Sequence, residues 1–179
     1  GKESRHVVEA IRTLEGKGEG KFHFNILTFS DGVDCWKETL VPASEKNKKE
    51  AIAFIEAQKL SKQTNTWAAL KVALDMAQGA KPRSKSIAPA DIPQVLDPNE
   101  LHLASYGAKE GADTLFLMTD GRPWVDGGPA DWEKIADQVR DYNRTKRVVI
   151  HTIGVGSQVI EPFLRRLAEE SGGTYVHVP

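Results

Sequence analysis

Two short, uninterrupted apolar runs constrain the fold of this chain more than any other feature of its sequence. They occupy residues 115–118 and 148–150, and each is followed by a segment with apolar residues at helical spacing. Continuous apolar runs of this length are typical of strands that are buried on both faces of a parallel sheet. From Asp113 onward strand and helix patterns alternate, so the sequence predicts an α/β domain with parallel strands and right-handed crossovers.

The first half of the chain predicts three helices and a β-hairpin. Apolar residues at helical spacing indicate helices near residues 3–14, 51–55 and 70–77. Between the first two we expect a strand at 22–29, a hairpin turn at 30–32 and a half-polar edge strand at 35–41. Together these elements predict one domain over residues 1–179, with a doubly wound, mostly parallel sheet, flanking helices and one antiparallel edge strand.

Residues 79–112 do not fit this pattern. The segment holds four of the nine prolines and shows no clear periodicity. Because a connection of this length without structure of its own is uncommon inside a compact domain, we expect a surface insertion or a mobile loop.

The composition excludes several functional classes. Lys and Arg number 24 against 25 for Asp and Glu, a formal net charge of -1, which gives no reason to expect binding to nucleic acid. No apolar stretch approaches the roughly 20 residues of a transmembrane helix, so we expect no membrane insertion. The single cysteine, Cys35, cannot form an intramolecular disulfide and leaves the compartment open. Because the chain starts at Gly1 without a signal segment, we expect a piece of a longer protein.

Asp120 directly follows the apolar run at 115–118, within Thr119-Asp120-Gly121. In α/β sheets ligands bind outside the carboxyl ends of the parallel strands, which is where this carboxylate is expected. Gly121 allows the tight turn that would let a ligand approach. Thr-Asp-Gly is also a common turn sequence, so a plain turn is the simpler interpretation of Asp120 taken alone.

A second polar segment, Gln63-Thr64-Asn65-Thr66, stands at the expected start of the third helix. Either Asn65 or Thr66 can cap that helix, which leaves the hydroxyl of Thr64 for another partner. Hydroxyl and carboxylate oxygens together suit a hard cation such as Mg²⁺, which keeps several waters and accepts few protein ligands.

The motifs of several enzyme classes are missing. The sequence contains no Gly-x-Ser-x-Gly elbow, no phosphate-binding Walker loop and no His-Glu-x-x-His pair. The Gly-Val-Gly-Ser segment at 154–157 lacks the third glycine of a dinucleotide loop, and the five histidines show no ligand-like spacing. We expect Trp36 and Trp67 to be packing residues. Trp124, in a loop rich in Gly and Pro, either anchors a partner or covers the end of the sheet.

Taken in order, these segments resemble the von Willebrand factor A domain family, which includes the integrin I domains. The matching segments are residues 24–31, 64–66 with 68–70, 115–121, 151–156 and 167–176. The resemblance covers nearly the whole chain apart from 79–112, and stand-alone bacterial members look most similar. It implies a doubly wound sheet with a metal-ion-dependent adhesion site at one end.

The resemblance also implies roles for two residues. Thr64 matches the family's threonine before a helix and Asp120 its aspartate after the fourth strand, so both are candidate ligands of Mg²⁺ or Mn²⁺. In the family a carboxylate of the partner protein typically fills the metal's remaining position, and the ion bridges the two proteins. The family's Asp-x-Ser-x-Ser motif is absent, since the segment 31–35 offers carboxylates without serines and follows the wrong strand.

The first strand of the family is also absent, because the chain begins at the expected first helix. The resemblance therefore predicts an N-terminally truncated domain. In the family that strand is central and lies between the strands at Phe22 and Thr114. Without it we expect a split sheet with an exposed apolar edge on each half. We also expect weak or no metal binding by these 179 residues.

The sequence thus predicts a protein-binding adhesion module with a partial metal site, and not an enzyme. The alternative is a metal-independent scaffold that binds partners through Trp124 and the segment 79–112. An enzyme of Rossmann-like type is a third interpretation, which rests on fold analogy alone. The partner, the compartment and the oligomeric state cannot be derived from these residues.

Overall fold

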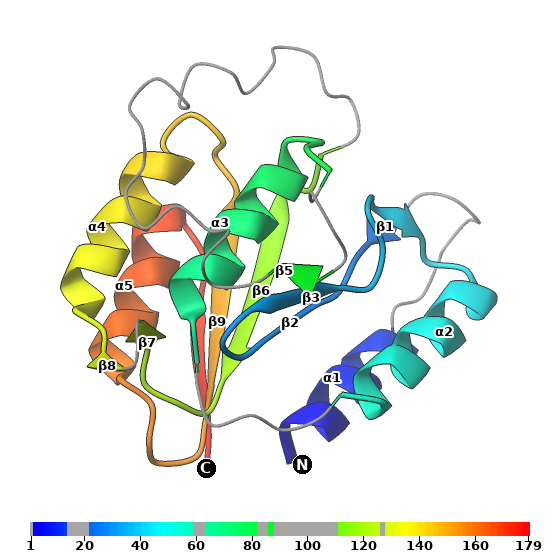
Figure 1. The fold of residues 1–179 in the computed structure, drawn as a ribbon, viewed down its shortest axis with the longest axis horizontal. Coiled ribbons are helices and arrows are strands. Elements are labelled where there is room, and N and C mark those ends of the chain that lie inside the picture. Colours follow the sequence, from blue (N-terminus) through cyan, green and yellow to red (C-terminus); the bar gives the residue numbers. More distant parts are fainter. Residues whose placement is uncertain (1, 14–21, 59–63, 82–85, 88–110, 126–127) are drawn as a thin grey trace.

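The structure, a computed structural model, describes residues 2–13, 22–58, 64–81, 86–87, 111–125 and 128–179. Helices and strands alternate along the second half of the chain, and the predicted α/β class is confirmed. In Figure 1, α3, α4 and α5 lie together on one side of the longest strands, whereas α1 and α2 form a pair at the other end of the molecule. None of the helices in the described ranges is long and apolar enough to cross a membrane.

The helices begin and end at residues with clear local causes. They are α1 (Lys2–Thr13), α2 (Glu45–Glu56), α3 (Thr66–Ala77), α4 (Trp132–Asn143) and α5 (Glu161–Ser171). The side chain of Ser44 accepts from the N–H of Asn47, and that of Asp131 from the N–H of Lys134, which are the expected N-cap bonds. α5 ends at Gly172, whose φ of 80° is the left-handed conformation that glycine adopts most easily.

Within the described residues, the strands form two three-stranded sheets and two short ribbons. The parallel sheet has the order β10-β9-β6, from β10 (Tyr175–Val178), β9 (Val149–Val155) and β6 (Thr114–Thr119). The antiparallel sheet has the order β2-β3-β5, from β2 (Leu27–Phe29), β3 (Val33–Cys35) and β5 (Ser86–Ile87). The ribbons pair β1 (His23–Phe24) with β4 (Val41–Pro42), and β7 (Trp124–Val125) with β8 (Gly128–Pro129).

Two predicted strands have different bounds in the structure. The strand expected at 22–29 is interrupted at Asn25 and Ile26, because the Asn25 side chain accepts the N–H groups of Ile26 and Lys37 and donates to the Lys37 carbonyl. The edge strand expected at 35–41 begins instead at Val33, directly after the hairpin turn, and ends at Cys35. It is the central strand of its sheet and not an edge strand, because β5 pairs with its other side. Most of the segment 79–112 lies outside the described residues, although its residues 86–87 form β5.

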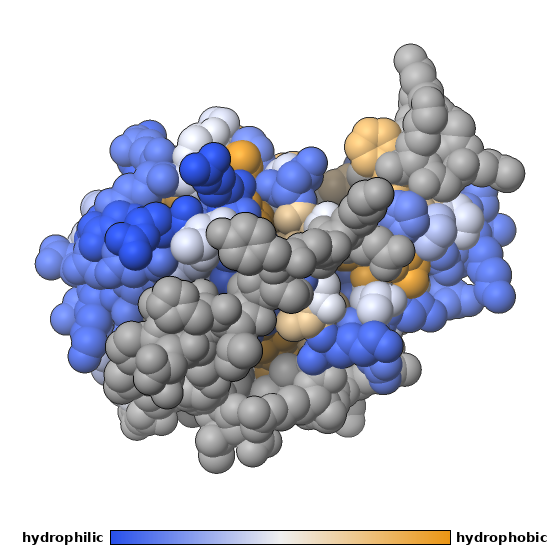
Figure 2. All heavy atoms as spheres, turned by 90° about the horizontal axis from the view of Figure 1, so that it is seen from above, coloured by the Kyte–Doolittle hydropathy of each residue, from blue (hydrophilic) through white to orange (hydrophobic). Residues whose placement is uncertain are grey.

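β2 and β6 belong to two different sheets, which agrees with the split sheet that was expected from the sequence. Each of these strands is paired on one side only in the described part of the chain, β2 with β3 and β6 with β9. Phe116, in the middle of β6, is 70% exposed and stacks on the ring of His151 at 5.0 Å between centroids. Viewed from above, hydrophobic residues reach the surface between two hydrophilic sides of the molecule (Figure 2).

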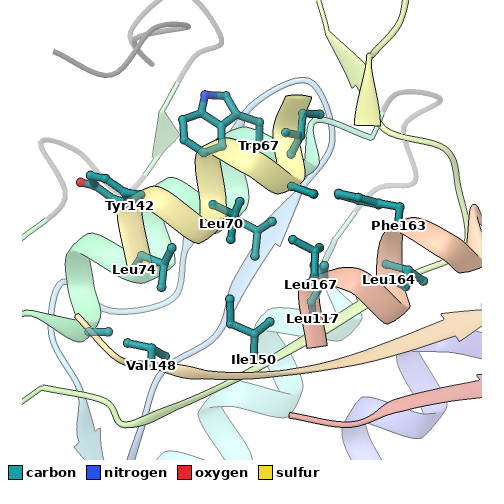
Figure 3. Packing of buried hydrophobic residues seen from close by; sticks show 14 residues of the cluster. Trp67, Leu70, Leu74, Leu117, Tyr142, Val148, Ile150, Phe163, Leu164 and Leu167 are labelled. Atoms are coloured by element: carbon teal, nitrogen blue, oxygen red, sulfur yellow. The ribbon is translucent and has the colours of Figure 1, made fainter. Parts of the chain in front are cut away.

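The helix α3 connects the two sheets through its side chains. One set of its residues, with Trp67, Leu70 and Leu74, packs into the cluster that contains Leu117 and Ile150 (Figure 3). A second set packs against Val33 and Cys35 of the antiparallel sheet: Ala68, Ala69, Val72 and Met76. Because two of its faces are buried, the helix is apolar nearly all round, and Trp67 and Trp36 are buried as predicted.

Candidate functional site

The two predicted site residues lie at the ends of different elements. Asp120 is exposed and directly follows β6, which ends at the buried Thr119. Thr64 is half-buried and stands two residues before the start of α3. Gly121 continues the turn after β6, and its N–H donates to the Thr119 hydroxyl at 3.3 Å.

The structure brings these two loops into contact. The hydroxyl oxygen of Thr64 lies only 2.8 Å from the position that a Cβ on Gly121 would occupy. The N–H of Trp124 donates to the Thr64 carbonyl at 2.9 Å, which fastens the loop after β6 to the loop before α3. The close approach of Thr64 therefore favours glycine at 121, a reason that the sequence alone does not reveal.

Asn65 attaches a third loop to this contact. Its side-chain oxygen caps α3 by accepting from the N–H of Ala68 at 3.0 Å. Its backbone N–H donates to the Ser30 carbonyl at 2.8 Å, and its side-chain amide donates to the Asp31 carbonyl at 3.4 Å. The turn between β2 and β3 therefore lies beside the start of α3 (Figure 1). The sequence indicated the cap but gave no sign of the link to this turn.

The donor set fits a hard cation only in part. The Thr64 hydroxyl and the Asp120 carboxylate are oxygen donors of the kind that Mg²⁺ and Mn²⁺ prefer. Within the described ranges, however, no group of three or more His, Cys, Asp or Glu side chains is arranged to hold a metal ion. Two oxygens match part of a coordination shell, and the other donors would have to be waters or groups from another segment.

A hollow of about 280 Å³ lies at the opposite end of the parallel sheet. It is lined by residues from the ends of α4 and α5 and from the start of β9, among them Asn143, Val148 and Ser171. Asn143 bonds both backbone groups of Val148, and the Ser171 hydroxyl accepts from the N–H of Ile150. These polar groups already form hydrogen bonds within the fold. None of the residues that line the hollow belongs to the loops around Thr64.

Trp124 belongs to the short β7–β8 ribbon that follows the Asp120 loop. The ribbon is held by the Ala130 N–H, which donates to the carbonyl of the fully buried Pro123 at 3.0 Å. The indole ring of Trp124 is half-buried, and its Nε1 is buried without a hydrogen-bond acceptor in the described part of the chain.

Comparison with known proteins decides the family. The sequence model of the von Willebrand factor type A domain matches residues 10–177. The chain belongs to this family. The loops that contain Thr64, Asn65 and Asp120 are therefore loops of a von Willebrand factor A domain. They follow one another along the chain in the order that the sequence resemblance predicted.

The relatives are large proteins. Inter-alpha-trypsin inhibitor heavy chain H2 of Homo sapiens is 26% identical over 173 residues, which are 97% of this chain and 16% of that protein. The human von Willebrand factor A domain-containing protein 3B is 26% identical over 167 residues, 92% of this chain and 10% of that protein. This chain thus spans about a sixth or less of the relatives it matches.

Solved structures confirm the fold. A von Willebrand factor type A protein from Catenulispora acidiphila superposes with a TM-score of 0.69 at 14% identity, over 98% of this chain and 33% of that one. Proximal thread matrix protein 1 from the mussel byssus, with a zinc-occupied metal-ion-dependent adhesion motif, gives a TM-score of 0.57 at 18% identity, over 98% of this chain and 38% of that one. At these identities the likeness concerns the fold alone.

Proposed function

We propose that this von Willebrand factor A domain is a protein-interaction module that binds its partner at the end of the sheet where the Thr64 loop meets the turn that holds Asp120 and Gly121. The observation that carries the proposal is the contact between Thr64 and Gly121, which sets a hydroxyl beside the Asp120 turn. Membership of the family supports an interaction module, and the zinc-occupied adhesion motif of the mussel protein supports a metal in such a domain.

In the complete domain, Thr64 and Asp120 serve as oxygen ligands of Mg²⁺ or Mn²⁺, directly or through a bound water. A carboxylate of the partner protein then completes the coordination shell. The strand that the family places between β2 and β6, with its Asp-x-Ser-x-Ser motif, supplies the remaining protein ligands. In the described ranges β2 pairs only with β3, and β6 only with β9. This supports this part of the proposal, because each strand has backbone groups for one more neighbour.

Calorimetric titration of residues 1–179 with Mg²⁺ and Mn²⁺ tests the proposal first. Because two oxygens seldom outcompete the hydration of Mg²⁺, we expect binding weaker than micromolar. Micromolar binding would contradict the view that the site is partial.

A polypeptide extended upstream should gain affinity and lose it in the Asp120→Ala variant. Asp113→Ala is the matched control, since Asp113 is an exposed aspartate just before the opposite end of β6. Metal binding that survives Asp120→Ala would refute the site.

A metal-independent interaction surface is the second candidate. It is favoured by the buried Nε1 of Trp124, which has no acceptor in the described ranges and stands in the loop next to Asp120. An upstream segment with an intact Asp-x-Ser-x-Ser motif supports the metal site, whereas a degenerate one supports this alternative. Binding of a partner that persists in excess EDTA would decide for the second candidate.

A further inference from the structure

We propose that Asn65 is a positioning residue that joins the turn between β2 and β3 to the Thr64 loop, so that three loops form the interaction surface. The inference rests on the proposed function, because it concerns the same end of the sheet. Its starting point is that Asn65 is only 4% exposed although its side chain is polar. A buried amide needs hydrogen-bond partners, and the side chain of Asn65 has them on α3 and on the turn after β2.

The bonds of Asn65 divide into two functions. The side-chain oxygen caps α3 through the N–H of Ala68, and any good N-cap residue can replace it there. The backbone N–H and the side-chain amide hold the carbonyls of Ser30 and Asp31. The amide carries its acceptor oxygen and its donor nitrogen on separate atoms, so Asn65 caps the helix through one and donates to the turn through the other.

The position of Asn65 connects this link to the site. Thr64, the preceding residue, contacts Gly121 through its hydroxyl and accepts from the Trp124 N–H through its carbonyl. One dipeptide therefore contacts the turn after β2 on one side and the loop after β6 on the other. Because β2 and β6 belong to separate sheets, this dipeptide and the buried faces of α3 set the distance between the two loops.

Three variants separate the two functions. Asn65→Ser and Asn65→Asp keep a capping oxygen but lose the amide nitrogen that donates to the Asp31 carbonyl, whereas Asn65→Ala loses both. By hydrogen exchange, we expect the amides of residues 30 and 65 to exchange at least tenfold faster in all three variants. The amide of Ala68 should exchange faster only in Asn65→Ala. Wild-type protection of residues 30 and 65 in Asn65→Ser would overturn the inference, whatever the protein binds.

The second measurement follows backbone amide shifts during titration with Mg²⁺, in the chain extended upstream. We expect residues 64 and 120 to respond in the wild type, with an apparent affinity at least threefold lower in Asn65→Ser. An unchanged affinity in a variant whose turn has loosened would show that Asn65 holds the turn without positioning the site. A wild type without any response would refute the proposed metal site instead, and the exchange data would still decide whether Asn65 joins the loops.

Discussion

The N–H of Trp124 donates to the carbonyl of Thr64 at 2.9 Å, across a sequence separation of sixty residues (124 minus 64). This bond fastens the loop after β6 to the loop before α3, at the point where the Thr64 hydroxyl meets Gly121. The candidate site therefore depends on packing between two loops. Substitutions that fill or empty the space between Thr64 and Gly121 test this dependence.

Gly121→Ala should separate the two loops. The added methyl would lie 2.8 Å from the Thr64 hydroxyl oxygen, closer than carbon and oxygen approach without bonding. We expect a loss of about 1–3 kcal/mol in the free energy of unfolding, which is typical of overpacking. Urea denaturation measures it. Thr64→Ala in the Gly121→Ala background removes the contact and should recover most of the loss. A double variant as unstable as Gly121→Ala would contradict this explanation.

Two adjacent glycines at the end of α5 should differ in their tolerance of alanine. A Cβ on Gly173 would lie 2.0 Å from the backbone carbonyl oxygen of Ile150, so Gly173→Ala must displace β9 or the end of α5. We expect a cost of more than about 3 kcal/mol. Gly172 has open space around it and a φ of 80°, so Gly172→Ala should cost only about 1–2 kcal/mol. Thermal unfolding of both variants checks the order, and equal costs would contradict it.

The ion pair between Lys146, just after α4, and Asp75 of α3 predicts that the stability of the fold changes with pH in the alkaline range. Lys146 forms an ion pair with Asp75 at 3.6 Å, and the Tyr142 hydroxyl donates to the same carboxylate. Burial lowers the pKa of Lys146 and outweighs the opposing effect of Asp75. Between this lowered pKa and about 10.4 the unfolded chain binds more protons, so the stability due to Lys146 should rise with pH.

The Lys146→Met variant isolates this contribution, because it keeps the aliphatic stem without the charge. When the free energy of unfolding is measured from pH 8 to 10.5, that of the wild type should increase relative to that of Lys146→Met as the pH rises. A difference that stays constant or shrinks would show that the carboxylate of Asp75, and not burial, dominates the pKa of Lys146.

The buried thiol of Cys35 should have the opposite effect at alkaline pH. Burial, with a smaller contribution from Asp34, raises its pKa to about 11. The unfolded thiol loses its proton near pH ~8.5, so the stability due to Cys35 is complete below that pH and is lost as the pH rises toward 11. Cys35→Ala should remove this decline.

Alkylation by iodoacetamide at pH 8.5 should follow the unfolded fraction, and rapid labelling of the folded chain would contradict the burial.

Much of the fold follows from local patterns in the sequence. The apolar runs at 115–118 and 148–150 predicted β6 and β9, and Asn65 was one of the two predicted caps of α3, because buried strands and caps are marked by residues close together in the sequence. The main local prediction that was wrong is the continuous strand at 22–29, and Asn25 is the reason. Its side chain interrupts the strand at 22–29 by bonding Lys37, a residue twelve positions away, and such a contact has no signature in a sequence pattern.

The sequence by itself determined the α/β class, the family resemblance and the two candidate ligands, Thr64 and Asp120. The tertiary structure alone decided that Thr64 contacts Gly121, that Asn65 holds the turn after β2, and that α3 connects two separate sheets. The physical reason is that helices, caps and turns form within a few residues, whereas contacts between loops arise only when the packing of distant segments fixes their separation.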